Sequence, residues 1–172
     1  TEPSCPDSLK RGSCKGKSCL YPEPCRKLRA DHTGYIELLR KIRALPKVKK
    51  VFIRSGIRYD YILADKSGDF LEELCRWHVS GQLKIAPEHI SPNVLRYMRK
   101  PGRAATEEFM RRYAKVNAKL GLKQFLVPYF ISAHPGSTLK EAVELAEFIR
   151  DSGLRPEQVQ DFTPTPGSLS TC

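Results

Sequence analysis

The stretch of residues 82–89 carries the first group of side chains in this sequence that could do chemistry. Polar and apolar residues alternate along it until Pro87, which predicts a strand that ends close to Glu88 and His89. Ser91 and Pro92 follow with the residue types of an N-cap and a first helical position. The polar cluster therefore lies between the carboxyl end of a strand and the amino end of a helix, where parallel α/β proteins bind ligands.

Four cysteines within the first thirty residues form the second group. Cys5, Cys14, Cys19 and Cys25 are separated by eight, four and five residues, among Pro, Gly, Ser and Lys with little apolar periodicity. Four thiolates can surround one tetrahedral metal, either zinc or the iron of an iron-sulfur cluster, and binding would then order the loop. Disulfides, or thiols in a loop without metal, fit the same spacing.

The overall composition is that of an ordinary globular protein with an excess of positive charge. Lys and Arg number 30 and Asp and Glu 19, a formal net charge of +11, spread over every expected helix. This charge suits an anionic partner or simply a solvated basic surface. No apolar run approaches the roughly 20 residues of a membrane span and no signal-peptide core is present, so we expect a cytoplasmic protein without membrane contacts, whose cysteines are thiols or metal ligands.

Hydrophobic periodicity predicts alternating helices and strands after the cysteine-rich segment. A helix with Tyr35, Leu38, Leu39, Ile42 and Leu45 on its inner face should end at Pro46. The expected order continues with a strand at 48–53, a helix at 69–79, the strand described above, helices at 91–99 and 106–120, a strand at 124–131, a helix from Thr138 to Gly153 and a strand at 158–163. This order indicates an α/β fold of about four parallel strands, either an open sheet or an arc of a (β/α) barrel.

Some finer features of these elements are also predictable. In the helix at 69–79, Phe70, Leu74 and either Trp77 or His78 should face inward, and Cys75 should be an inert core thiol. The turn after the strand at 124–131 contains His134 and leads to a capping box, so its backbone amides could hold an anionic or polar group. A plain strand-to-helix turn has the same pattern.

The sequence resembles a known superfamily through a series of segments in one order. They are SCLYPEPC with LRADH after it, VKKVFIRSGIRYD, HVSGQLKIAPEH with VLRYMRKP after it, PYFISAHPGST and QVQDFTPTPGS. Together they are similar to the radical S-adenosylmethionine superfamily, and within it to the YgiQ-like group. The resemblance implies a partial (β/α)₆ barrel of residues 31–172 after a cysteine-rich insertion at 1–30. It also implies a 4Fe-4S cluster and S-adenosylmethionine at the carboxyl ends of the strands, an electron donor, and a 5′-deoxyadenosyl radical that acts on an unknown substrate.

Residue roles follow from this resemblance only where the segments align. Side chains at the strand ends would contact S-adenosylmethionine: Ser55, Lys84, Glu88, Tyr129, Ser132, His134, Phe162 and Thr163. The superfamily holds its cluster with a CxxxCxxC loop, and the cysteines here lack that spacing. We therefore expect the cluster ligands to lie outside this chain, in the remainder of its own barrel, and the four cysteines to carry zinc, an auxiliary cluster or no metal.

Two other classes of function fit parts of the sequence. A class I aldolase-like barrel would use Lys84 as a Schiff-base amine, with Glu88 or His89 for proton transfer. A nucleic-acid-binding module would use the cysteines as a zinc site and the net charge for phosphates. The absence of aromatic residues interleaved with basic ones in the cysteine-rich segment disfavours the second class.

Overall fold

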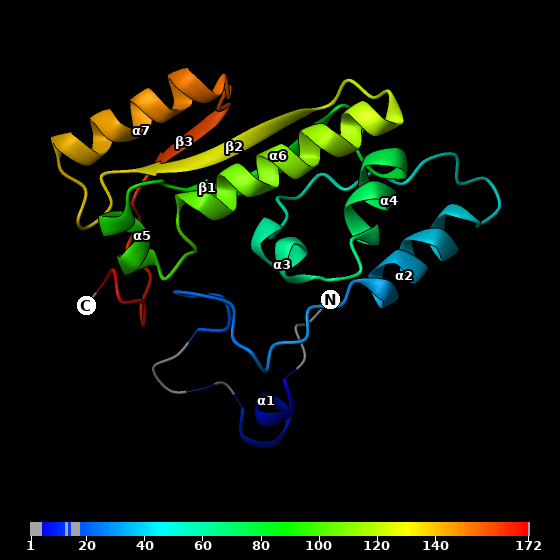
Figure 1. Ribbon diagram of the computed structural model, residues 1–172, viewed down its shortest axis with the longest axis horizontal. Helices are drawn as coiled ribbons and strands as arrows, with labels where there is room; N and C mark the ends of the chain where they lie inside the picture. The colour runs from blue at the N-terminus through cyan, green and yellow to red at the C-terminus, as the bar shows by residue number, and fades with distance from the viewer. Residues whose placement is uncertain (1–4, 13, 15–17, 172) are drawn as a thin grey trace.

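The computed structural model describes residues 5–12, 14 and 18–171, which form helices around a small parallel sheet (Figure 1). The elements in chain order are α1 (Pro6–Arg11), α2 (Thr33–Arg43), α3 (Tyr59–Ala64), α4 (Asp69–Trp77), β1 (Gln82–Glu88), α5 (Pro92–Met98), α6 (Arg103–Leu120), β2 (Phe125–Ser132), α7 (Leu139–Ser152) and β3 (Gln158–Asp161). The predicted α/β class is confirmed. Two short helices, α1 and α3, were not predicted because six residues give too little periodicity to detect.

The sheet has the order β1-β2-β3, with both neighbouring pairs parallel. Within the described residues the sheet therefore has three strands, where the sequence predicted about four. The strand expected at 48–53 is wrong, because these residues form no regular strand. Contact with β1 comes only later in the chain, at Ile57, through one parallel bridge to Ile85 and a hydrogen bond from the Ile57 amide to the Lys84 carbonyl at 3.0 Å. No described strand lies on its outer side, so nothing extends these contacts into a regular ladder.

The main core lies between one face of the sheet and the helices that cover it. Leu83 and Ile85 of β1 pack with Leu74 of α4 and Phe109 of α6 in one buried cluster. A second cluster joins the end of β2 to α7 through Phe130, Phe148 and Ile90. Leu83 of β1 pairs with Leu126 of β2, and Phe130 lies on the same face of the strand as Leu126, so both clusters lie on one face of the sheet. The helices α4, α6 and α7 thus cover one face.

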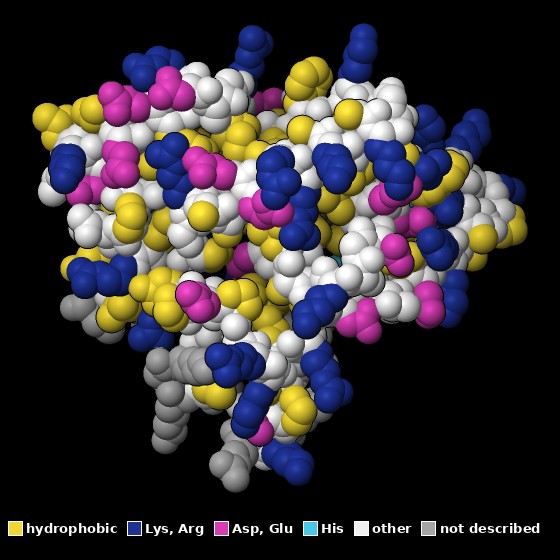
Figure 2. All heavy atoms as spheres, in the orientation of Figure 1, with side chains coloured by type: hydrophobic (Ala, Val, Ile, Leu, Met, Phe, Trp, Pro, Cys, Tyr) yellow, Lys and Arg dark blue, Asp and Glu magenta, His cyan; other side chains and the backbone are white. Residues whose placement is uncertain are grey.

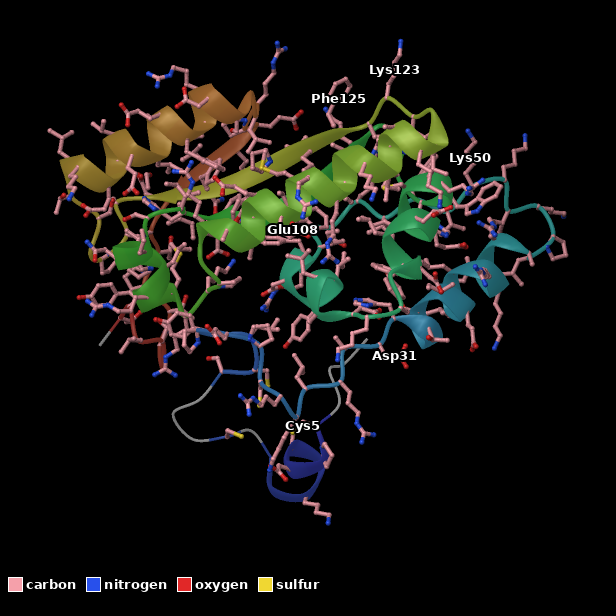
Figure 3. All side chains as sticks on the ribbon, viewed as in Figure 1. Cys5, Asp31, Lys50, Glu108, Lys123 and Phe125 are labelled. Atoms are coloured by element: carbon pink, nitrogen blue, oxygen red, sulfur yellow. The ribbon has the colours of Figure 1, made fainter. Side chains whose placement is uncertain are left out.

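The opposite face of the sheet is left open by the described helices. Lys84 and Phe125 lie on it, and Phe125 is 66% exposed. Figure 3 shows the Phe125 side chain projecting outward at the beginning of β2. β3 is exposed at all four of its positions. The prediction of a strand at 124–131 buried on both faces is therefore wrong at Phe125, although Val127 on the same face is buried.

Several predicted inner faces also need correction. In α2 the buried residues are Ile36 and Leu39, whereas Leu38 is 51% exposed and Leu45, beyond the helix, is 55% exposed. Trp77 is 47% exposed, with the Arg43 guanidinium 4.3 Å from its ring centroid. A cation–π contact stabilises an aromatic ring that remains partly in water. Hydrophobic periodicity alone does not reveal such a contact.

The end of α4 resolves the choice between Trp77 and His78. His78 is fully buried, and its Nδ1 lies 2.8 Å from the carbonyl oxygen of Val51. Phe70, Leu74 and Cys75 are buried as predicted, and desolvation raises the pKa of the Cys75 thiol to about 12. Cys75 is therefore a neutral core thiol.

The surface charge follows the predicted spread. Lys and Arg side chains are scattered across the face in Figure 2, with acidic side chains among them. Several form helical ion pairs, such as Arg112 with Glu108 at 2.6 Å and Arg103 with Glu107 at 2.7 Å. None of the helices in the described ranges has the length and apolar character that crossing a membrane requires.

Candidate functional site at the carboxyl ends of the strands

Glu88 ends β1 in an unusual backbone conformation. Its φ of 65° lies in the left-handed region, and the pairing with β2 changes register between Ile85 and Glu88. Lys100, in the connection between α5 and α6, donates to Glu88 Oε1 at 2.6 Å and to the Ala86 carbonyl at 2.8 Å. The strand end thus presents a carboxylate and an ammonium group side by side.

Lys100 was missed by the sequence analysis. It lies twelve residues after Glu88 and follows a helix, so no spacing rule connects the two. The only sequence signal is the Lys-Pro-Gly that separates α5 from α6 and predicts a turn. Side-chain exposures of 23% for Glu88 and 19% for Lys100 leave both groups partly accessible to solvent.

The ends of β2 and β3 carry a second polar group. Ser132 donates to Asp161 Oδ1 at 2.5 Å, and Tyr129 donates to Gln160 Oε1, also at 2.5 Å. The Phe162 amide donates to the Ser132 carbonyl at 2.9 Å. Since Glu88 pairs with Phe130 and Ser132 with Asp161, both polar groups lie at the same edge of the sheet.

His134 begins the turn between β2 and α7 and is buried. Its Nδ1 lies 2.8 Å from the Pro135 carbonyl, and its ring meets Phe162 edge-on with centroids 4.6 Å apart. Gly136, at a φ of 84°, is required here, because a Cβ would come 2.6 Å from a ring carbon of Tyr97. Tight packing between this turn and α5 fixes His134 beside the end of β3.

The remaining predicted residues lie farther from this arrangement. Lys84 is the third residue of β1, and its exposed side chain lies on the open face, below the strand end. Ser55 and Thr163 are exposed in the connections before α3 and after β3. The structure thus groups Glu88, Tyr129, Ser132, His134 and Phe162 at the carboxyl edge, and places Ser55, Lys84 and Thr163 around it.

His89, directly after β1, does not supply a charge to this edge. Its Nδ1 accepts a hydrogen bond from the Ser91 amide at 3.0 Å, so the ring is neutral in this tautomer. Burial is the main cause that lowers its pKa, and nearby His134 lowers it further, whereas Glu144 and Glu141 act in the opposite direction. His89 is therefore a packing residue, which removes it as a proton-transfer group.

The four cysteines of the amino-terminal segment face a common pocket of about 390 Å³. The other wall includes Arg58 and Tyr61, at α3, and Met98 and Arg99, at the end of α5. No three His, Cys, Asp or Glu side chains within the described ranges converge closely enough to hold a metal ion as they stand. The sequence predicted that the four cysteines share one site. It did not predict that α3 and the end of α5 would form the other wall of that site.

Taken together, these elements define an α/β protein with a three-stranded parallel sheet, whose polar side chains gather at one edge. No protein-family model matches the chain. It is 55% identical over 170 residues to a protein of Clostridium perfringens strain 13, and 56% identical over 168 residues to one of Clostridium botulinum strain Okra, both named UPF0313 protein. The matches cover 99% and 98% of this chain but only 26% of each relative, so the chain spans about a quarter of their length.

Proposed function

We propose that this chain is part of a radical S-adenosylmethionine enzyme and supplies one arc of the surface that binds S-adenosylmethionine. The observation that supports the proposal is the gathering of polar side chains, led by the Glu88–Lys100 pair, at the carboxyl edge of parallel strands whose opposite face is open. An arc of a barrel has this form, with helices outside and an inner face that further strands would close. The remaining strands belong to the rest of the longer protein.

The residues at the edge fit the groups of S-adenosylmethionine. The Glu88 carboxylate can accept hydrogen bonds from ribose hydroxyls or the methionyl ammonium group, and Lys100 can pair with the methionyl carboxylate. A carboxylate has about four acceptor positions, so Lys100 occupies only part of the capacity of Glu88. Phe162, fixed against His134, offers an apolar surface for the adenine.

The cluster itself would be held outside this chain. Cys14, Cys19 and Cys25 lack the CxxxCxxC spacing, and no three thiols converge to ligand distance in the part that the structure describes. When bound, a reduced 4Fe-4S cluster would supply the electron that cleaves S-adenosylmethionine into methionine and a 5′-deoxyadenosyl radical. The residues of this chain would hold the cofactor in place, and the substrate and the electron donor would approach from the rest of the barrel.

The exposure of Lys84 disfavours the aldolase alternative. A Schiff-base lysine is activated by desolvation or by a neighbouring cation, whereas the Lys84 side chain is exposed on the open face of the sheet. Of the two residues considered for proton transfer, His89 is buried and accepts a hydrogen bond at Nδ1, which leaves only Glu88 for that role. We therefore keep the radical S-adenosylmethionine enzyme as the proposed function.

The complete protein tests this proposal directly. After anaerobic purification and reconstitution with iron and sulfide, it should bind S-adenosylmethionine in calorimetry and form 5′-deoxyadenosine on reduction with dithionite. The same preparation without reductant is the control for spontaneous breakdown. A reconstituted protein that carries a cluster but neither binds S-adenosylmethionine nor yields 5′-deoxyadenosine would refute the proposal.

A further inference from the structure

The amino-terminal segment has few apolar side chains with which to fold. Among its described side chains in residues 5–30, Cys5 and Leu20 are the buried apolar ones, with 7% and 4% exposure. An exposed ion pair joins Lys27 to Asp7 at 2.5 Å, and such pairs contribute little to stability because water and salt screen them. A further source of stability is needed for this segment to hold one conformation.

The backbone nevertheless places the four cysteines around one pocket. The Cys25 amide donates to the Cys19 carbonyl at 2.8 Å, which closes the loop between these two cysteines. Cys5 is the N-cap residue of α1 and lies between that helix and the rest of the molecule (Figure 3). Cys14 completes the set, and all four line the same pocket although nineteen residues lie between the first and the last.

We propose that Cys5, Cys14, Cys19 and Cys25 form a tetrathiolate metal centre that orders the amino-terminal segment beside α3 and the end of α5. Four cysteine ligands in a tetrahedral set suit zinc or an iron-sulfur cluster, both of which share this thiolate chemistry. The thiols have to draw together by local movement for the metal to bind. Metal binding would then supply the stability that the apolar side chains do not, as in other small metal-ordered segments.

The charges on the opposite wall of the pocket support this proposal. Arg58 and Arg99 line the pocket together with the cysteines. Zinc with four thiolates has a net charge of −2, and adjacent guanidinium groups lower the cost of forming the thiolates and holding that charge. Arg58 also pairs with Asp60 at 2.5 Å, which fixes it in position.

The position of the centre connects it to the candidate site at the strand ends. Arg99 on the pocket wall directly precedes Lys100, the partner of Glu88. A metal centre there would order the cysteine loop next to the end of α5, beside the loop that presents the Lys100 ammonium group. This centre is separate from the cluster of the proposed function, so the two can be tested independently.

Metal analysis of the complete protein tests the inference. The wild type, the double variant Cys14→Ser/Cys19→Ser and the control Cys75→Ala should be purified anaerobically, and zinc, iron and sulfide measured per chain. Cys75 is a matched control because it is a buried cysteine that does not line the pocket. We expect the double variant alone to lose one zinc, or the iron and sulfide of one cluster, with visible absorbance distinguishing the two. Equal metal content in all three proteins would overturn the proposal.

Thiol alkylation provides a second readout that does not depend on the variants folding. Cys14 is exposed, so without a metal it should react rapidly with iodoacetamide. We expect protection of Cys14, Cys19 and Cys25 in the native protein, and at least tenfold faster alkylation after treatment with a strong chelator. Alkylation of Cys14 at the same high rate with and without chelator would also overturn the proposal.

Discussion

The Glu88 carboxylate owes its position to backbone strain and to a partner distant in the sequence. A non-glycine residue at positive φ is uncommon, and such strain persists only where the surroundings enforce it. Here the Lys100 ammonium group contacts both the Glu88 carboxylate and the Ala86 carbonyl, and these two contacts hold the strand end in this conformation. The strain at Glu88 is therefore a further reason to regard the residue as functional.

Replacement of Glu88 tests its role. In the complete protein, Glu88→Ala should weaken S-adenosylmethionine binding by about 1–3 kcal/mol, the usual cost of losing a hydrogen bond to a charged or buried group. Calorimetry measures the dissociation constant. Glu107→Ala is the control, because Glu107 also forms an ion pair, with Arg103, but on the exposed surface of α6. Identical affinities for wild type and a folded Glu88→Ala protein would remove Glu88 from the site.

The buried pair His32 and Asp65 is a second residue-scale feature, and it anchors the chain where the cysteine-rich segment meets α2. Asp65 Oδ2 lies 2.6 Å from His32 Nδ1 and accepts from the His32 amide at 3.1 Å. The Ser67 amide and hydroxyl donate to Asp65 Oδ1. Burial alone would raise the pKa of Asp65, but these hydrogen bonds outweigh it and lower the pKa.

Loss of this anchor should destabilise the fold. Asp65→Ala leaves the buried amide and ring nitrogen of His32 without their partner, which costs about 1–3 kcal/mol for a buried group, whereas the exposed Ser67 can turn to water. Urea denaturation of the complete protein should show a lower unfolding midpoint for the domain. Asp151→Ala removes an exposed carboxylate that pairs with Arg150, and we expect almost no change from it. A midpoint for Asp65→Ala equal to that of Asp151→Ala would contradict the assignment.

At the scale of elements, α7 is the helix whose start was predicted best. The sequence placed a capping box at Thr138 and Glu141, and both reciprocal bonds are present. Glu141 is linked to α5 as well, since Asn93 donates to its Oε1 at 3.1 Å. The hydrogen bonds from the Thr138 side chain, its amide and Asn93 lower the pKa of Glu141 to about 2.

The Glu141 cap should make the stability of the folded protein fall as the pH becomes acidic. Because the pKa of Glu141 is lower in the folded protein than in the unfolded chain, its contribution is complete above about pH 4.5 and is lost as pH falls toward 2. Thermal unfolding measured across this range should therefore show a shallower loss of stability for Glu141→Gln, which does not titrate. Parallel pH profiles for wild type and variant would show that the cap contributes nothing to the acid transition.

The elements also show what sequence patterns can and cannot predict. Helices with long amphipathic repeats and the strands β1, β2 and β3 were found, with ends shifted by a few residues. The strand expected at 48–53 failed because a β-branched run forms a strand only where neighbours pair with it. For the site, strand-end residues such as Glu88 and Ser132 were predictable, but Lys100 and Asp161 were not, since each reaches the edge through tertiary contacts.

At the scale of the whole molecule, the sheet has one face that the described helices leave partly uncovered. Its open face carries Lys84 and the exposed Phe125, and β3 is exposed along its length. Polar side chains collect at one edge, and the chain spans 26% of the length of the relative from Clostridium perfringens strain 13. In the proposed enzyme the rest of the protein would close this face and bring the cluster to the edge.

The 172 residues should be catalytically silent as an isolated chain. A 4Fe-4S cluster that activates S-adenosylmethionine needs three thiolates close together and an open iron, and such ligands come from one short loop. The cysteines of this chain face their own pocket with a different spacing. Even after iron-sulfur reconstitution and reduction, the isolated chain should therefore form no 5′-deoxyadenosine above a no-protein control, whereas a protein of the full length of the relatives should form it. Formation of 5′-deoxyadenosine by the short chain would mean that Cys5, Cys14, Cys19 or Cys25 holds the working cluster, and the separate metal centre would have to be reassigned.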